Sequence, residues 1–232
     1  MAIMTLGRSS KGKASVRPNL SVRVNLAAWY RYRIGVTNIN GSASAWADQS
    51  GNMRPLLQAT ASNRPAVVSD GSLLFDGSDN YMQATFTLAQ PFTVYLAFSP
   101  VTHTNNDVIF DGVTATTTLS QDTTTGTYDI NAGTALASTG TIVAASNGVI
   151  ACVFNTTTSV IQTANGAASV TTSGDANTND AGGITLGASR TPGSYSNIRV
   201  FEMAVYSVAH DAPTRLQILR YFGRIAQVGG IT

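Results

Sequence analysis

Charged residues are scarce in this sequence, at 11% of 232 positions, and lysine occurs only at Lys11 and Lys13. The one cysteine, Cys152, excludes an internal disulfide, and its place in the apolar run GVIACVF predicts a buried thiol in a strand. No apolar run approaches the roughly 18 residues of a membrane-spanning helix. A single glutamate, Glu202, and two histidines leave few groups for acid–base chemistry.

The composition is instead rich in residues that favour strands and turns. The chain has 21 glycines and about 30 threonines, a composition that favours strands and turns over helices. Short apolar runs recur at close intervals, and the run FTVYLAF at 92–98 is nearly continuous, as expected of a central strand. Asn165-Gly166 is typical of a type I′ hairpin turn.

Two segments carry the most specific turn signals. LLFDGSDNYM, Leu73 to Met82, places Asp-Gly and further turn formers between two alternating apolar runs, which predicts a hairpin corner. WADQSGN, Trp46 to Asn52, predicts a strand that ends in a Ser-Gly-Asn turn.

The C-terminal part follows a different pattern. Ser196 to Tyr206 predicts a long strand, and a helical period follows over residues 212–226. Asp211 is suited to cap this helix and Pro213 to occupy its first turn. The apolar residues recur at three- and four-residue spacing, so Arg215, Arg220 and Arg224 are expected to face outward.

Together these segments resemble the laminin-G-like branch of the concanavalin A-like lectins and glucanases, over Leu26 to Ala226. The resemblance implies an all-β fold, a two-sheet antiparallel jelly-roll sandwich with a short C-terminal helix at 212–226. We expect a basic N-terminal arm at 1–23 and one sandwich domain at 24–232. Because this fold serves many functions, the resemblance specifies function poorly.

The basic residues are concentrated at the start of the chain. Seven positive charges occupy the first 33 positions, and no acidic residue precedes Asp48. We expect an arm that docks on an acidic partner, while a solvated tail is the alternative and nucleic acid is less favoured because aromatic residues are missing there. The docking residues expected are Arg8, Lys11, Lys13, Arg17 and Arg23.

Catalytic patterns are missing from the sequence. Related endoglucanases carry Glu-x-Asp-x-Glu on one strand, and the strand neighbours of Glu202 are the apolar Val200 and Ala204. No Gly-x-Ser-x-Gly elbow, zinc pattern or phosphate loop is found. The sequence therefore predicts a protein that is not an enzyme and needs no cofactor.

Two ligand sites are worth considering. Laminin-G-like domains often bind calcium through loop oxygens, and Asp76 and Asp79 are the candidates, although two carboxylates in one turn are few for calcium and a plain turn is favoured. Arg190 and Tyr195, in the segment GASRTPGSY, could offer a bidentate donor and a stacking ring to a glycan. Tyr195 could equally begin the next strand.

The function expected from these observations is a non-enzymatic bacteriophage virion structural protein: a capsid decoration, head-fibre or tail-associated subunit that docks by its arm. The alternative is a carbohydrate-binding, lectin-like adhesin or receptor-binding module. Partners would be the major capsid or tail protein, further copies of the chain or a cell-surface glycan, with no membrane. The basic residues follow the apolar start instead of preceding it, which argues against a signal peptide and for synthesis in the host cytoplasm.

Overall fold

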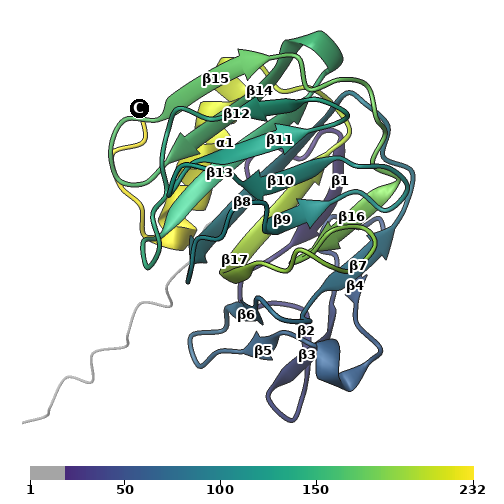
Figure 1. Ribbon diagram of the computed structural model, residues 1–232. Helices are drawn as coiled ribbons and strands as arrows, with labels where there is room; N and C mark the ends of the chain where they lie inside the picture. Colours follow the sequence, from purple (N-terminus) through teal and green to yellow (C-terminus); the bar gives the residue numbers. More distant parts are fainter. Residues whose placement is uncertain (1–18) are drawn as a thin grey trace, which may run out of the picture.

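The computed structural model describes residues 19–232, which form an antiparallel β structure with one C-terminal helix (Figure 1). The strands are β1 (Leu26–Tyr30), β2 (Val36–Ile39), β3 (Ser42–Trp46), β4 (Leu56–Leu57), β5 (Ala66–Val67), β6 (Leu73–Asp76), β7 (Met82–Thr85), β8 (Phe92–Pro100), β9 (Val108–Asp111), β10 (Thr118–Gln121), β11 (Tyr128–Asn131), β12 (Ala135–Ala137), β13 (Gly148–Phe154), β14 (Ser159–Ala164), β15 (Val170–Gly174), β16 (Gly183–Leu186) and β17 (Asn197–Tyr206). The helix α1 is Ala212–Ala226, and two 3-10 turns span Ala61–Asn63 and Thr156–Thr158.

The strands belong to one sheet that folds back on itself, and its two sides face each other. On one side β8 pairs with β13 and β17, and β1, β14 and β15 extend this layer. On the other side β16 pairs with β7 and β9, and β10 to β12 follow. The short strands β6, β5, β3 and β4 connect β17 to β7. The all-β fold and the terminal helix are confirmed, but the strands form one connected sheet.

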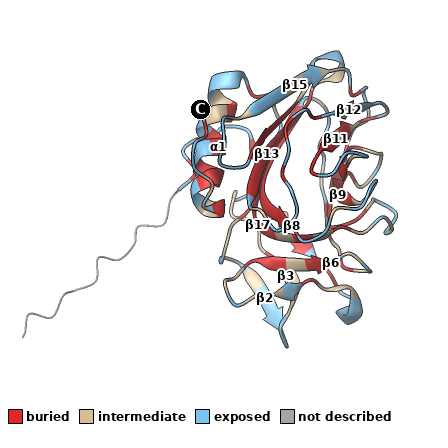
Figure 2. Cartoon of the chain, turned by 60° about the vertical axis from the view of Figure 1, so that its left-hand side comes forward, coloured by how far each residue is buried: buried red, intermediate tan, exposed pale blue. Residues whose placement is uncertain are grey.

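The layer around β8 is buried on both faces. Phe92, Val94, Leu96 and Phe98 pack against the second layer, whereas Tyr95 and its neighbour Ala97 pack against α1. Figure 2 shows β13, β8 and β17 between the helix and the strands β9 and β11. This placement explains the nearly continuous apolar run at 92–98, because neither face of the strand meets water. Cys152 in β13 is buried as predicted, and burial raises the pKa of its thiol.

The segment 73–82 is a corner between layers and not a hairpin. β6 pairs with β5 and β17, whereas β7 pairs with β4 and β16. The turn residues were recognised correctly, but a turn alone does not say which partners its two strands take. The hairpin expected at Asn165-Gly166 is also wrong in type: Gly166 has a φ of 102°, Asn165 is not left-handed, and five residues separate β14 from β15.

Helix α1 covers the outer face of the β8 layer. The Asp211 side chain accepts a hydrogen bond from the Thr214 N–H at 3.0 Å, which caps the helix as predicted. Arg215 does not face outward; it is buried and donates to Gln162 Oε1 and to the His210 carbonyl at 3.0 and 2.9 Å. Within residues 19–232, this helix is too short and too polar to cross a bilayer.

Candidate functional site

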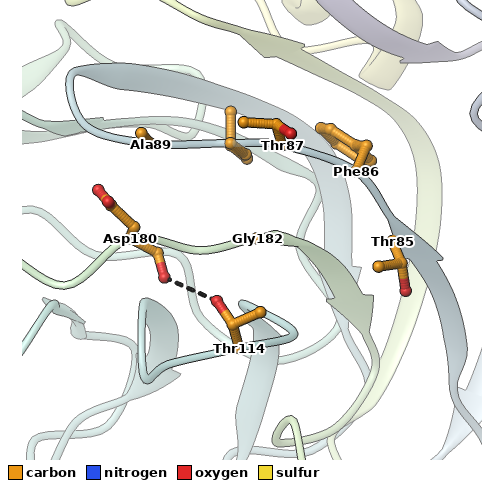
Figure 3. Close-up of a pocket in the computed structure, with 8 residues that line it drawn as sticks. Thr85, Phe86, Thr87, Ala89, Thr114, Asp180 and Gly182 are labelled. Carbon is orange, nitrogen blue, oxygen red and sulfur yellow. Dashed lines mark hydrogen bonds between the residues drawn. The ribbon is translucent and has the colours of Figure 1, made fainter.

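A pocket of about 450 Å³ lies where three segments meet beside the strands β7, β9 and β16 (Figure 3). The segments are 85–89, which begins at the last residue of β7, the loop 112–117, which follows β9, and 175–182, which precedes β16. The lining residues are Thr85, Phe86, Thr87, Leu88, Ala89, Thr114, Asp180 and Gly182. Pockets with a few convergent polar groups are the usual form of small-ligand sites.

Backbone hydrogen bonds fix the three segments relative to one another. The N–H groups of Ala181 and Gly182 donate to the Leu88 carbonyl at 2.9 and 3.2 Å, and the Val113 N–H donates to the Ala181 carbonyl at 2.7 Å. Glycine is required next to them: a Cβ on Gly183, where φ is 130°, would lie 2.2 Å from the Ala84 carbonyl oxygen. The pocket is therefore preformed by main-chain contacts.

The pocket presents a carboxylate and several hydroxyls. Asp180 is exposed, and its Oδ1 accepts a hydrogen bond from the Gln90 N–H at 2.8 Å, which leaves Oδ2 for a ligand. Thr114 is exposed and donates to the Asp180 carbonyl at 3.2 Å, the contact drawn in Figure 3. Hydroxyls both donate and accept and a carboxylate only accepts, so this set complements a ligand rich in hydroxyl groups.

An aromatic ring lines the pocket, and a cation stacks on this ring. Phe86 is half-buried, and the Arg54 guanidinium carbon lies 4.6 Å from its ring centroid. Asp48 positions Arg54, because its carboxylate accepts hydrogen bonds from the Arg54 N–H at 3.2 Å and the Trp29 N–H at 2.8 Å. The segment WADQSGN thus forms a turn closed by its own aspartate, which fixes the Arg54 backbone, and the Arg54 guanidinium donates to the Ala27 carbonyl at 3.1 Å.

Arg190 and Tyr195 lie close to this site but do not line the pocket. Both are in the loop after β16; the Arg190 N–H donates to Asp111 Oδ2 at 2.8 Å, and Tyr195 forms an isolated backbone bridge with Val108. Asp111 is buried and also accepts from the Thr117 N–H at 2.9 Å, so it links this loop to the loop 112–117. Burial raises the pKa of Asp111 despite these hydrogen bonds. Glycan binding by Arg190 and Tyr195 stays a prediction.

Asp76 and Asp79 hold a turn together. Asp76 Oδ1 accepts from the Ser78 N–H at 2.9 Å, and Asp79 Oδ1 accepts from the Asn80 side-chain amide at 3.0 Å. Across residues 19–232, no group of three or more metal-ligating side chains is found at this turn or elsewhere.

Of the expected docking residues, Arg8, Lys11, Lys13 and Arg17 lie outside the described residues. Arg23 is exposed, and its guanidinium carbon lies 5.0 Å from the Trp29 ring centroid. Its Nη2 donates to Asn19 Oδ1 at 2.8 Å. Docking on a partner stays a prediction for all five, as do the expected oligomer and location.

The sequence did not indicate the residues of the pocket itself. Phe86, Thr114 and Asp180 come from three distant parts of the chain, and none stands in a catalytic or ligand-binding motif. The Gly-Gly pair after Asp180 was a usable signal, because glycine in a strand often marks close approach of another backbone.

Comparisons with solved structures find folds similar to this chain in parts of larger proteins. Trypanosoma rangeli sialidase, in complex with 2,3-difluorosialic acid, matches 90% of this chain with a TM-score of 0.61 and 14% identity. A GH54 α-L-arabinofuranosidase matches 80% with a TM-score of 0.63 and 13% identity, and an arabinofuranosidase complexed with arabinofuranosyl-α-1,2-xylobiose matches 80% with 0.60 and 17%. The chain spans 34% of the sialidase and 51% of each arabinofuranosidase. No protein-family model and no curated protein matches the sequence.

These likenesses confirm the all-β fold in general terms and correct two expectations. The expected non-enzymatic phage virion protein is wrong, since the similar structures are glycosidases. The expectation that the chain is not an enzyme is contradicted by the same finding. The virion expectation depended on the fold resemblance, the basic arm and the scarce catalytic groups, and the expectation of no enzyme depended on missing motifs. The missing Glu-x-Asp-x-Glu excludes one arrangement of carboxylates and not every arrangement. The lectin-like alternative agrees better with these neighbours.

Proposed function

We propose that this chain is a carbohydrate-recognising β-sandwich of the jelly-roll type that binds a neutral glycan in the pocket of Figure 3. The observation that carries the proposal is the combination of an exposed carboxylate, Asp180, with threonine hydroxyls and the edge of Phe86 in one preformed pocket. The fold supports it, because the structurally similar proteins act on carbohydrates.

Each group has a role in this proposal. Asp180 Oδ2 accepts hydrogen bonds from two neighbouring sugar hydroxyls, and Thr87 and Thr114 donate to or accept from others. Phe86 provides an apolar edge for the C–H face of a sugar ring, and Arg54 keeps that ring in place. A cell-surface glycan, already the alternative partner expected from the sequence, is the ligand class that fits.

The test is a glycan array followed by calorimetry with the best ligand. A hydrogen bond to a charged group contributes about 1.5 to 3 kcal/mol, so Asp180→Ala should weaken binding by about tenfold or more. Phe86→Ala should weaken it as well. Asp175→Ala is the matched control, because Asp175 is an exposed aspartate of the same segment that does not line the pocket. Equal affinity in Asp180→Ala and the wild type contradicts the proposal.

Hydrolysis of the bound glycan is a second candidate, favoured by the glycosidases among the similar structures. Asp180 is the carboxylate of the pocket and would serve as one member of the pair that glycosidic cleavage requires. Release of reducing ends from array-positive glycans by the wild type, and its loss in Asp180→Asn with binding retained, would establish this activity. Binding without release in the wild type restricts the function to recognition.

A further inference from the structure

A second pocket, of about 180 Å³, lies on the helix-bearing side of the molecule. Its walls come from five places: the segment after β1 with Tyr32 and Arg33, the turn before β6 with Asp70, the loop before β13 with Asn147, the strand β17 with Arg199 and Phe201, and the end of α1. None of these residues lines the pocket of Figure 3, so the two pockets are separate.

Two arginines are held together at this pocket by one aspartate. Arg199 Nη2 lies 2.5 Å from Asp70 Oδ2 in an ion pair, and it also donates to Ser72 Oγ at 3.2 Å. Arg33 donates through Nε to the carbonyl oxygen of the same Asp70, and the Tyr32 hydroxyl donates to that carbonyl at 2.9 Å. Both guanidinium groups are therefore fixed around one residue.

Aromatic rings support both cations. The Arg33 guanidinium carbon lies 4.7 Å from the Tyr32 ring centroid, and that of Arg199 lies 5.8 Å from the Phe201 centroid. The two rings contact edge to face with centroids 5.7 Å apart. Stacking on a ring restricts a guanidinium without using its hydrogen-bond donors, so the donors stay available for a ligand.

The pocket has more positive than negative charge and unused donors. Arg33 and Arg199 contribute two positive charges, against one negative charge on Asp70. Burial acts to raise the pKa of Asp70, but hydrogen bonds from Ser72 and the charge of Arg199 outweigh it, and the pKa lies below its ordinary value. Asp70 is therefore ionised at neutral pH, and its carboxylate accepts a hydrogen bond from Nη2 of Arg199. The terminal nitrogens of Arg33 and Nη1 of Arg199 have no hydrogen-bond partner within residues 19–232.

We propose that this second pocket binds an oxyanion, the carboxylate or sulfate group of a small acidic ligand, between the free donors of Arg33 and Arg199. The planar fork of a guanidinium matches two oxygens of one carboxylate or sulfate, and an arginine held by stacking loses less side-chain entropy on binding. An acidic sugar bound here would extend recognition beyond the neutral-glycan pocket, and the inference stands without that pocket.

Titration of the full chain with sodium sulfate and with sodium glucuronate, at constant ionic strength and followed by NMR, tests this inference. We expect saturable shifts at the amides of Tyr32 to Gly35 and of Asp70 and Gly71. Arg33→Gln, an exposed position, should weaken binding about tenfold and leave the melting temperature unchanged. Arg220→Gln removes an equal charge from an exposed position on α1 and should change the affinity less than twofold.

The two ligands distinguish a sulfate site from a carboxylate site, because preference for one identifies the oxyanion that is recognised. Shifts that do not saturate, or equal weakening in Arg33→Gln and Arg220→Gln, would show general attraction of anions to a basic surface and overturn the proposal. If Arg33→Gln loses sulfate and glucuronate binding but still binds neutral glycans, the oxyanion site is independent of the proposed glycan site.

Discussion

Glu202 is the residue whose role the sequence concealed most completely. Its carboxylate is buried and accepts hydrogen bonds from Trp29 Nε1 and the Tyr221 hydroxyl, each at 2.6 Å, and from the Tyr32 N–H at 3.1 Å. Burial raises the pKa of Glu202, although these donors and Arg31 act to lower it. The sequence shows a lone glutamate among apolar neighbours, but its partners lie up to 173 residues away. The structure shows that it joins β1, β17 and α1.

His210 offers a prediction about pH. Its Nδ1 lies 2.8 Å from the Tyr95 hydroxyl, and burial lowers its pKa from 6.5. The unfolded chain therefore takes up a proton at a pH where the folded chain does not, so the free energy of unfolding should fall as the pH drops below about 6.5. Urea titrations between pH 7.5 and 5 measure this slope.

The effect of His210 is read as a difference between variants, because Glu202 titrates in the opposite sense. His210→Gln should have a shallower slope than the wild type. Parallel pH curves for the wild type and His210→Gln would contradict the assignment.

At the scale of elements, the sequence predicted the type and position of several elements better than it predicted what they pair with or pack against. The run 92–98, the strand ending at Tyr206 and the helix 212–226 are all observed. The corner at Asp76-Gly77 was misread because pairing is decided between strands that are distant in the chain, such as β6 with β17. Arg215 was misplaced because helical periodicity does not show that Gln162 and the His210 carbonyl satisfy a buried guanidinium.

Helix α1 should contribute strongly to stability through its apolar face. Phe222 is fully buried against the β8 layer, with its ring centroid 5.9 Å from that of Tyr95. Phe222→Ala should lower the free energy of unfolding by about 3 to 5 kcal/mol, because it leaves a cavity in a packed core. Gln217→Ala, on the exposed face of the same helix, should change it by less than about 0.5 kcal/mol. Equal effects would mean that the helix is not packed as described.

At the scale of the whole molecule, composition indicated the fold class but not the function. Scarce charge and abundant threonine are properties of the scaffold, and they are shared by proteins with unrelated functions. The virion function was inferred from a fold resemblance, a basic arm and scarce catalytic groups, none of which identifies a binding site. The pocket of Figure 3 depends instead on what three loops bring together, which no single segment of the sequence shows.

The two tryptophans make the cooperativity of the whole molecule measurable. Trp46 lies in the core between the layers and Trp29 in the core beneath α1, and β8, β13 and β17 supply residues to both cores. Because the cores share these strands, both should unfold in one step. In Trp29→Phe and in Trp46→Phe, the fluorescence of the remaining tryptophan should follow the same urea curve as circular dichroism. Separate midpoints within one variant would show that one core unfolds alone.

The burial of β8, β13 and β17 on both faces also bears on how the chain can change over evolution. The side chains of these strands pack into one core or the other, so selection there is for volume and shape. The segments 85–89, 112–117 and 175–182 are under no such constraint at their exposed positions, Thr87, Thr114 and Asp180 among them. Substitutions in these loops can therefore change which ligand is bound while the buried strands stay the same. A library randomised at these three positions would sample specificity while leaving the buried strands intact.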